Sequence, residues 1–108
     1  LVSMMFAYES SASEEVIDLQ IHNVSRDRLR KRRIARTDVL LGLQDRWACP
    51  VHGIWGAKDA LYKSTLERVP QVLHRLDSFQ VVPDAGHWVM FEKPDAFHAL
   101  VDKLLVKK

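Results

Sequence analysis

The sequence has few of the features that mark secreted, membrane or unstructured proteins. Its single cysteine, Cys49, excludes an internal disulfide framework, so a reducing, cytoplasmic location is expected. No apolar run approaches the roughly 18–20 residues that span a bilayer. Residues 1–7 lack the basic flank and the long apolar core of a signal peptide. The chain begins with Leu rather than Met, which favours a start inside a longer protein.

An excess of one charge is also lacking, because the net charge is only +2 over 108 residues. One segment, residues 26–36, departs from this balance, since its only acidic residue is Asp27. It lacks the aromatic residues used for base stacking and carries no recognition motif, so a solvated helix face is favoured over a phosphate-binding surface. We therefore expect neither nucleic acid nor a membrane as partner. The basic residues of this segment are Arg26, Arg28, Arg30, Lys31, Arg32, Arg33 and Arg36.

What is present predicts a mixed α/β chain in two portions. Residues 1–47 read as helical: Ser11 and Glu14 have capping-box spacing, an apolar stripe follows, and a short helix is expected near residues 39–43. Residues 48–108 read as strand, loop, helix, strand, loop, helix, a pattern typical of a parallel sheet covered by helices. The expected strands are residues 51–56 and 79–82, and the expected helices run from a capping box at Ser64 and Glu67 toward Leu76, and from Pro94 onward.

Two strands do not form a parallel sheet that is stable alone. We therefore expect neighbouring strands from an upstream segment, from a second chain, or from another copy through an exposed strand edge.

Two residues that could do chemistry follow the two strands. Asp59 comes just after the first strand and His87 just after the second. Loops at the carboxyl ends of neighbouring parallel strands emerge at the same edge, where open α/β sheets bind ligands. A carboxylate that holds one ring N–H of a histidine lets the other ring nitrogen take a proton from a nucleophile. Trp88 is a candidate substrate-binding residue that could shield such a site from water. Glu92 is interpreted as a helix-start carboxylate favoured by the dipole.

These segments resemble the C-terminal part of the α/β-hydrolase superfamily. Residues 50–59, Pro-Val-His-Gly-Ile-Trp-Gly-Ala-Lys-Asp, are similar to the strand and Gly-x-x-Asp that carry the triad acid. Residues 85–97 begin Ala-Gly-His-Trp and continue with Glu-x-Pro and an aromatic residue, and they look like the segment with the triad histidine. The order acid then histidine also agrees. The resemblance covers roughly residues 48–106 and implies that residues 1–47 belong to a helical cap.

The sequence lacks the nucleophile motif of this family. None of the four glycines, at 42, 53, 56 and 86, frames a serine as the family's Gly-x-Ser-x-Gly elbow requires. The resemblance implies hydrolysis of an ester-type or related bond of a small-molecule substrate, with Asp59 and His87 as catalytic residues, only when another segment completes the triad. The chain alone is expected to be inactive, and the alternative is a truncated, non-catalytic binding or assembly module. No cofactor and no metal are expected, because no Cys/His spacing indicates zinc.

Overall fold

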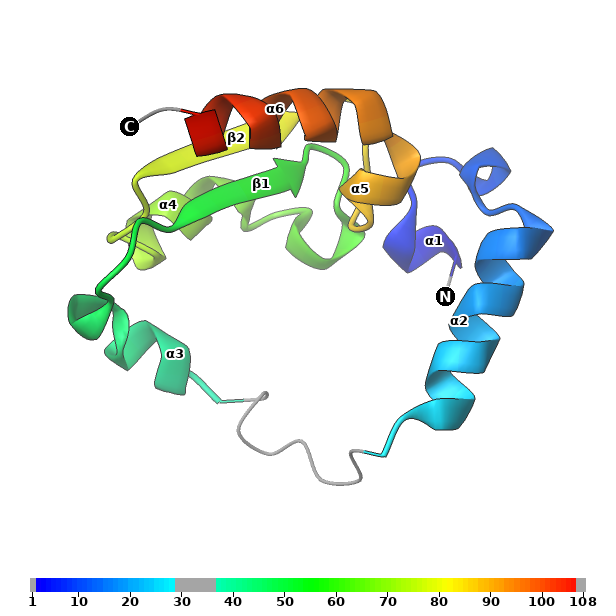
Figure 1. Cartoon of the computed structure of the whole chain (residues 1–108), viewed down its shortest axis with the longest axis horizontal. Helices are drawn as coiled ribbons and strands as arrows, with labels where there is room; N and C mark the ends of the chain where they lie inside the picture. Colours follow the sequence, from blue (N-terminus) through cyan, green and yellow to red (C-terminus); the bar gives the residue numbers. More distant parts are fainter. Residues whose placement is uncertain (1, 29–36, 107–108) are drawn as a thin grey trace.

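The computed structural model describes residues 2–28 and 37–106, which form helices around a small parallel sheet (Figure 1). Short 3₁₀ turns connect several of these elements. The chain is therefore of mixed α/β class, as the strand and helix pattern predicts. The helices and strands in chain order are α1 (Val2–Met5), α2 (Glu14–Arg26), α3 (Val39–Gly42), β1 (His52–Gly56), α4 (Val69–Val72), β2 (Ser78–Val82), α5 (Val89–Glu92) and α6 (Pro94–Val106).

The sheet of the described residues consists of β1 and β2, which pair in parallel. Its register runs from His52 opposite Ser78 to Gly56 opposite Val82, so both strands end together. The residues just before the two strands are also hydrogen-bonded to each other, because the Asp77 amide donates to the Val51 carbonyl at 2.8 Å. The two strands predicted from the sequence are thus present, each within one residue of its expected start.

Helix α6 lies along one face of the sheet, and α4 lies on the other side (Figure 1). The buried core is small and sits beneath the carboxyl ends of the strands. Phe97 and Leu100 of α6, three residues apart, pack against this core, as the apolar stripe in the sequence predicts. Packing at this position holds the two loops that leave the strands. The core comprises Val82, Ala85 and Val89, with Ile54, Phe97 and Leu100 packed against them.

The predicted capping box at the start of α2 is wrong. Ser13, not Ser11, caps the helix, and its hydroxyl accepts a hydrogen bond from the Val16 amide. The Ser11 hydroxyl instead donates to the Glu92 carboxylate at 2.8 Å. A tertiary partner therefore takes the side chain that local spacing had assigned to the helix end.

The long helix predicted from Ser64 toward Leu76 is also wrong. The chain forms a 3₁₀ turn at Leu66–Arg68 and then the short α4, which ends at Val72. Gln44 explains this early end, because its buried amide donates to the Val72 carbonyl at 2.8 Å and its oxygen accepts from the Arg75 amide at 3.3 Å. A buried side chain from another segment thus satisfies the backbone where the helix stops.

The predicted apolar stripe of α2 is present but poorly covered, since Ile21 and Val24 are more than half exposed. Most of the basic segment 26–36 lies outside the described residues, which end at residue 28 and resume at 37. No helix in the described part of the chain is long and apolar enough to cross a membrane.

Candidate functional site

The two loops after β1 and β2 lie against each other at the carboxyl edge of the sheet. The Ala57 amide donates to the Val82 carbonyl at 2.9 Å, and the Lys58 amide donates to the Ala85 carbonyl at 2.8 Å. Gly56 permits this approach, because a Cβ atom there would overlap the carbonyl oxygens of Ala85 and Gly86. The strand ends and the glycine therefore place Asp59 and His87 on adjoining backbones.

The structure brings Asp59 and His87 together. The Asp59 Oδ2 atom lies 2.9 Å from His87 Nδ1, and its Oδ1 accepts a hydrogen bond from the Leu61 amide at 3.0 Å. The carboxylate caps the 3₁₀ turn Ala60–Tyr62, and it is only 3% exposed. One buried side chain thus serves both the local turn and the histidine.

The geometry of the pair fixes what the imidazole can do. An ionised Asp59 carboxylate only accepts hydrogen bonds, so the His87 ring donates from Nδ1 and leaves Nε2 as the acceptor. Within the part of the chain that the structure describes, Nε2 makes no hydrogen bond. The His87 side chain is 34% exposed, so the ring is partly accessible to solvent. The arrangement suits proton transfer by Nε2.

Trp88 lies next to His87 and begins α5, but its ring faces the N-terminal part of the chain. It packs edge-on against Phe6 at 5.4 Å between ring centroids and tilted against Phe91 at 5.7 Å. The cavity of about 150 Å³ that Trp88 lines is formed by α1, the chain after it and α2, not by Asp59 or His87. The indole therefore supports the loop of residues 83–88 that carries His87, which we call the histidine loop, from one side.

A larger apolar cavity of about 630 Å³ lies on the α3 and α4 side of the sheet. Trp55 and Tyr62 line it together with Leu41, Val69 and other side chains. Tyr62 belongs to the turn that Asp59 caps. One wall of the cavity is therefore close in sequence to residues 57–59, which we call the acid loop. Neither Asp59 nor His87 lines it.

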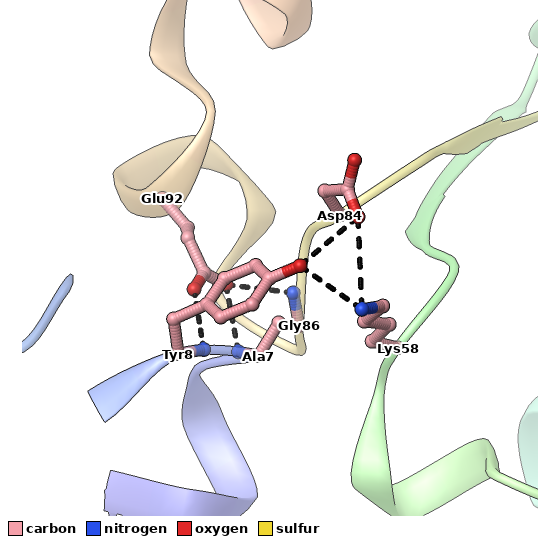
Figure 2. A network of polar contacts seen from close by, with 6 residues as sticks. All are labelled: Ala7, Tyr8, Lys58, Asp84, Gly86 and Glu92. Carbon is pink, nitrogen blue, oxygen red and sulfur yellow. Dashed lines mark hydrogen bonds and ion pairs between the residues drawn. The ribbon is translucent and has the colours of Figure 1, made fainter. Parts of the chain in front are cut away.

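No pattern in the sequence indicated one prominent feature of the structure, the contacts of residues 5–11 with the histidine loop. We call residues 5–11 the N-terminal strap. The Ala7 amide and the Tyr8 amide each donate to one Glu92 carboxylate oxygen at 2.9 Å, and the Gly86 amide donates to the same carboxylate at 2.7 Å (Figure 2). Glu92 lies in the single turn of α5, in agreement with its interpretation as a helix-start carboxylate, and its side chain also accepts hydrogen bonds from these backbone amides.

Charge and hydrogen bonding shift the pKa of two groups here. Partial burial by itself would raise the pKa of Glu92, but hydrogen bonds from Ala7, Gly86, Tyr8 and Ser11 outweigh it and hold the pKa below its ordinary value. The hydrogen bond with the Tyr8 hydroxyl, assisted by the charge of Asp84, raises the pKa of Lys58. Both shifts favour the charged form of each group.

Tyr8 joins the two loops at their outer side. Its hydroxyl accepts a hydrogen bond from Lys58 Nζ at 2.9 Å and donates to Asp84 Oδ1 at 3.0 Å (Figure 2). Asp84 has a φ of 58°, the left-handed conformation that aspartate tolerates better than most side chains. The strap thus contacts both the acid loop and the histidine loop.

Among residues 2–28 and 37–106, no group of three or more His, Cys, Asp or Glu side chains could hold a metal ion. Comparison with known proteins found no family model, no curated protein and no solved structure that matches the chain.

Proposed function

We propose that this chain supplies the acid and the histidine of a hydrolase of the α/β-hydrolase type. Asp59 orients the ring of His87 and stabilises its protonated form. His87 Nε2 takes the proton of a nucleophile and later gives it to the leaving group. The substrate is a small molecule with an ester-type or related bond, and neither a metal nor a cofactor takes part in the proposed reaction.

The observation that carries this proposal is the contact of 2.9 Å between a buried carboxylate and a partly exposed imidazole. The two residues come from separate loops at one sheet edge, which is where open α/β sheets place ligand-binding groups. Structural Asp–His pairs also occur on protein surfaces, but the burial of Asp59 and the free Nε2 are the features that a general base requires.

The nucleophile in this proposal comes from another segment or from a second chain. The sequence holds no Gly-x-Ser-x-Gly elbow, and Cys49 is exposed ahead of β1 rather than after a strand. The upstream strands that would complete the sheet beside β1 are the natural carriers of such an elbow. The isolated chain is therefore proposed to be inactive as a triad hydrolase.

The first test is the reactivity of His87 in the isolated chain. Acylation of histidine rings by diethyl pyrocarbonate requires an unprotonated, accessible nitrogen. We expect His87 to react faster than His22, His52, His74 and His98, and we expect Asp59→Asn to remove this advantage. Peptide mapping after brief exposure measures the rates. Equal reactivity of all five histidines would contradict the proposed role of the pair.

The second test is hydrolysis of a short-chain aryl ester. The chain alone is expected to show no turnover above His87→Ala. Co-expression with a polypeptide that carries the nucleophile elbow should restore turnover, which His87→Ala should abolish and Asp59→Asn should lower by about 10⁴-fold, as loss of the acid does in a serine protease. Restored turnover that survives His87→Ala would sink the proposal.

A second candidate function is a non-catalytic assembly module. The observations that favour it are exposed apolar side chains, such as Leu40 and Leu105 at 59% and 76% exposed, and a described sheet of two strands only. Large exposed apolar surfaces mark interaction sites in globular proteins. Association without turnover would support this candidate.

A further inference from the structure

We infer that Glu92 is a positioning residue for His87, which it holds in place by tying the N-terminal strap across the histidine loop. The inference deepens the proposed function and rests on it for its biological meaning. The structural part of the inference can be tested without any enzymatic turnover, because it concerns only the backbone on either side of His87.

Glu92 accepts hydrogen bonds from two parts of the chain that are far apart in sequence. Its Oε1 accepts from the Gly86 amide at 2.7 Å and from the Ala7 amide at 2.9 Å. Its Oε2 accepts from the Tyr8 amide at 2.9 Å and from the Ser11 hydroxyl at 2.8 Å. Each carboxylate oxygen thus takes two donors, and Oε1 alone joins the strap to the histidine loop.

The peptide groups on both sides of His87 are held by this arrangement. The Gly86 amide before it is bonded to Glu92, and the Trp88 amide after it donates to the Met5 carbonyl at 2.8 Å. The ring itself is held by Asp59. The strap therefore fixes where the His87 backbone lies, and Asp59 fixes how its ring is turned.

Close packing reinforces the hydrogen bonds. A Cβ atom on Gly86 would come within 2.5 to 2.9 Å of backbone atoms of Phe6 and Ala7, so the strap lies directly on the loop. Phe6 is buried and packs edge-on against Trp88. Strap and loop are thus in contact at a point where only glycine fits.

A carboxylate is the group that this position requires. A glutamine has one acceptor oxygen, and its NH₂ group would face two of the four donors. Hydrogen bonds to a charged acceptor are also stronger than those to a neutral one. Replacing Glu92 by Gln therefore keeps the size of the side chain, leaves two of the four donors without an acceptor, and weakens the hydrogen bonds of the other two because the acceptor is no longer charged.

The test compares Glu92→Gln with Glu67→Gln, a matched change at an exposed glutamate on the turn before α4. The first readout is amide hydrogen exchange at Ala7, Tyr8 and Gly86. We expect roughly 10- to 100-fold faster exchange in Glu92→Gln, from the usual strength of hydrogen bonds to charged groups. Glu67→Gln should match the unaltered chain.

The second readout is the nitrogen chemical shifts of the His87 ring, which report which nitrogen carries the proton. The unaltered chain and Glu67→Gln should show the proton fixed on Nδ1. Glu92→Gln should show a mixture of tautomers, because the loop no longer holds the ring against Asp59. A structural role confined to the strap would change exchange at Ala7 and Tyr8 but leave the ring signals unchanged, and that result would overturn the inference.

Ser11→Ala covers the case in which Glu92→Gln does not fold. It removes one of the two donors to Oε2, so the carboxylate is held less firmly in the orientation that Oε1 needs for the Gly86 amide. Faster exchange at Gly86 than in the unaltered chain is therefore expected, and unchanged exchange overturns the inference. Failure of the proposed hydrolase function looks different: Glu92→Gln would still alter the His87 ring, but no completed complex would turn over an ester.

Discussion

Asp59 shows how one side chain can bind a local and a distant partner at the same time. Its Oδ1 caps the turn Ala60–Tyr62, which is the ordinary role of an aspartate after a strand. Its Oδ2 reaches His87 from the same buried position. The hydrogen bond with the Leu61 amide orients the carboxylate, so its other oxygen is already in place to accept a hydrogen bond from His87. A structural role for Asp59 and a catalytic one are therefore compatible.

Glu92 leads to a prediction about pH. Its pKa in the folded chain lies below its ordinary value of about 4.5, so the ionised carboxylate stabilises the folded state. This stabilisation is fully present above the ordinary pKa and is lost as the pH falls through the folded value. Urea unfolding should show that Glu92→Gln destabilises the chain at neutral pH, and the difference between the two chains should shrink as the pH falls well below 4.5.

Glu67→Gln is the control for this titration, because its side chain is exposed on the turn Leu66–Arg68. Its unfolding curve should follow that of the unaltered chain at every pH. A difference between Glu92→Gln and the unaltered chain that stays constant down to the most acidic pH would show that the charge of Glu92 contributes nothing.

At the scale of elements, the site depends on two parallel strands that end in register. Gly56 and Val82 are paired residues, and the loops that follow them are hydrogen-bonded to each other from their first residues. The short core under these ends holds the loops from below, and the N-terminal strap holds the histidine loop from outside. The pair is thus positioned by three separate parts of the chain.

Gly56→Ala should separate the two loops. The added methyl group would overlap the Ala85 and Gly86 backbone, and relief requires the histidine loop to move. We expect a loss of about 1–3 kcal/mol in the free energy of unfolding, the usual cost of overpacking. Asp59 and His87 should also lose their contact, which the ring nitrogen signals of His87 would show.

Gly42→Ala is the matched change, because a Cβ atom there has no neighbour within 4 Å. Gly42 ends α3, where alanine is the better helix former, so stability should stay equal or rise by up to about 1 kcal/mol. Equal losses in both variants would show that the close approach at Gly56 has no special cost.

At the scale of the whole molecule, the described residues bury few large apolar side chains. The buried apolar residues are Phe6, Val69, Val82, Ala85 and Val89. In the described ranges 2–28 and 37–106, the sheet has two strands, and each strand has one partner. A two-stranded sheet is marginal by itself, so a further strand or a covering surface would add stability.

Self-association is therefore expected at high protein concentration, with a strand edge as the contact. Val81 is partly exposed on β2, and Val81→Lys should weaken association by placing a charge at this strand. Val24→Lys on the exposed face of α2 is the control. Sedimentation velocity over a range of concentrations measures the effect. Loss of association in Val24→Lys alone would assign the contact to α2 instead.

The sequence by itself determined the α/β class, the two strands and the last helix, because these depend on local patterns. Residues 51–56 and 79–82 are short apolar runs bounded by turn residues, and α6 has a regular apolar stripe with proline at its start. The parallel topology that this pattern predicts also places Asp59 and His87 at one edge, since parallel strands end on the same side.

Only the tertiary structure decided which serine caps α2, where α4 ends and what holds the histidine loop. Ser11, Gln44 and Glu92 each bind backbone or side-chain groups that lie 28 or more residues away, apart from the Gly86 amide and the local Leu41 carbonyl. Such contacts leave no periodic signal, because each is a single hydrogen bond between distant segments. Local patterns determined the two strands and the last helix, whereas long-range hydrogen bonds of Ser11, Gln44 and Glu92 determined the end of α4 and the support of the histidine loop.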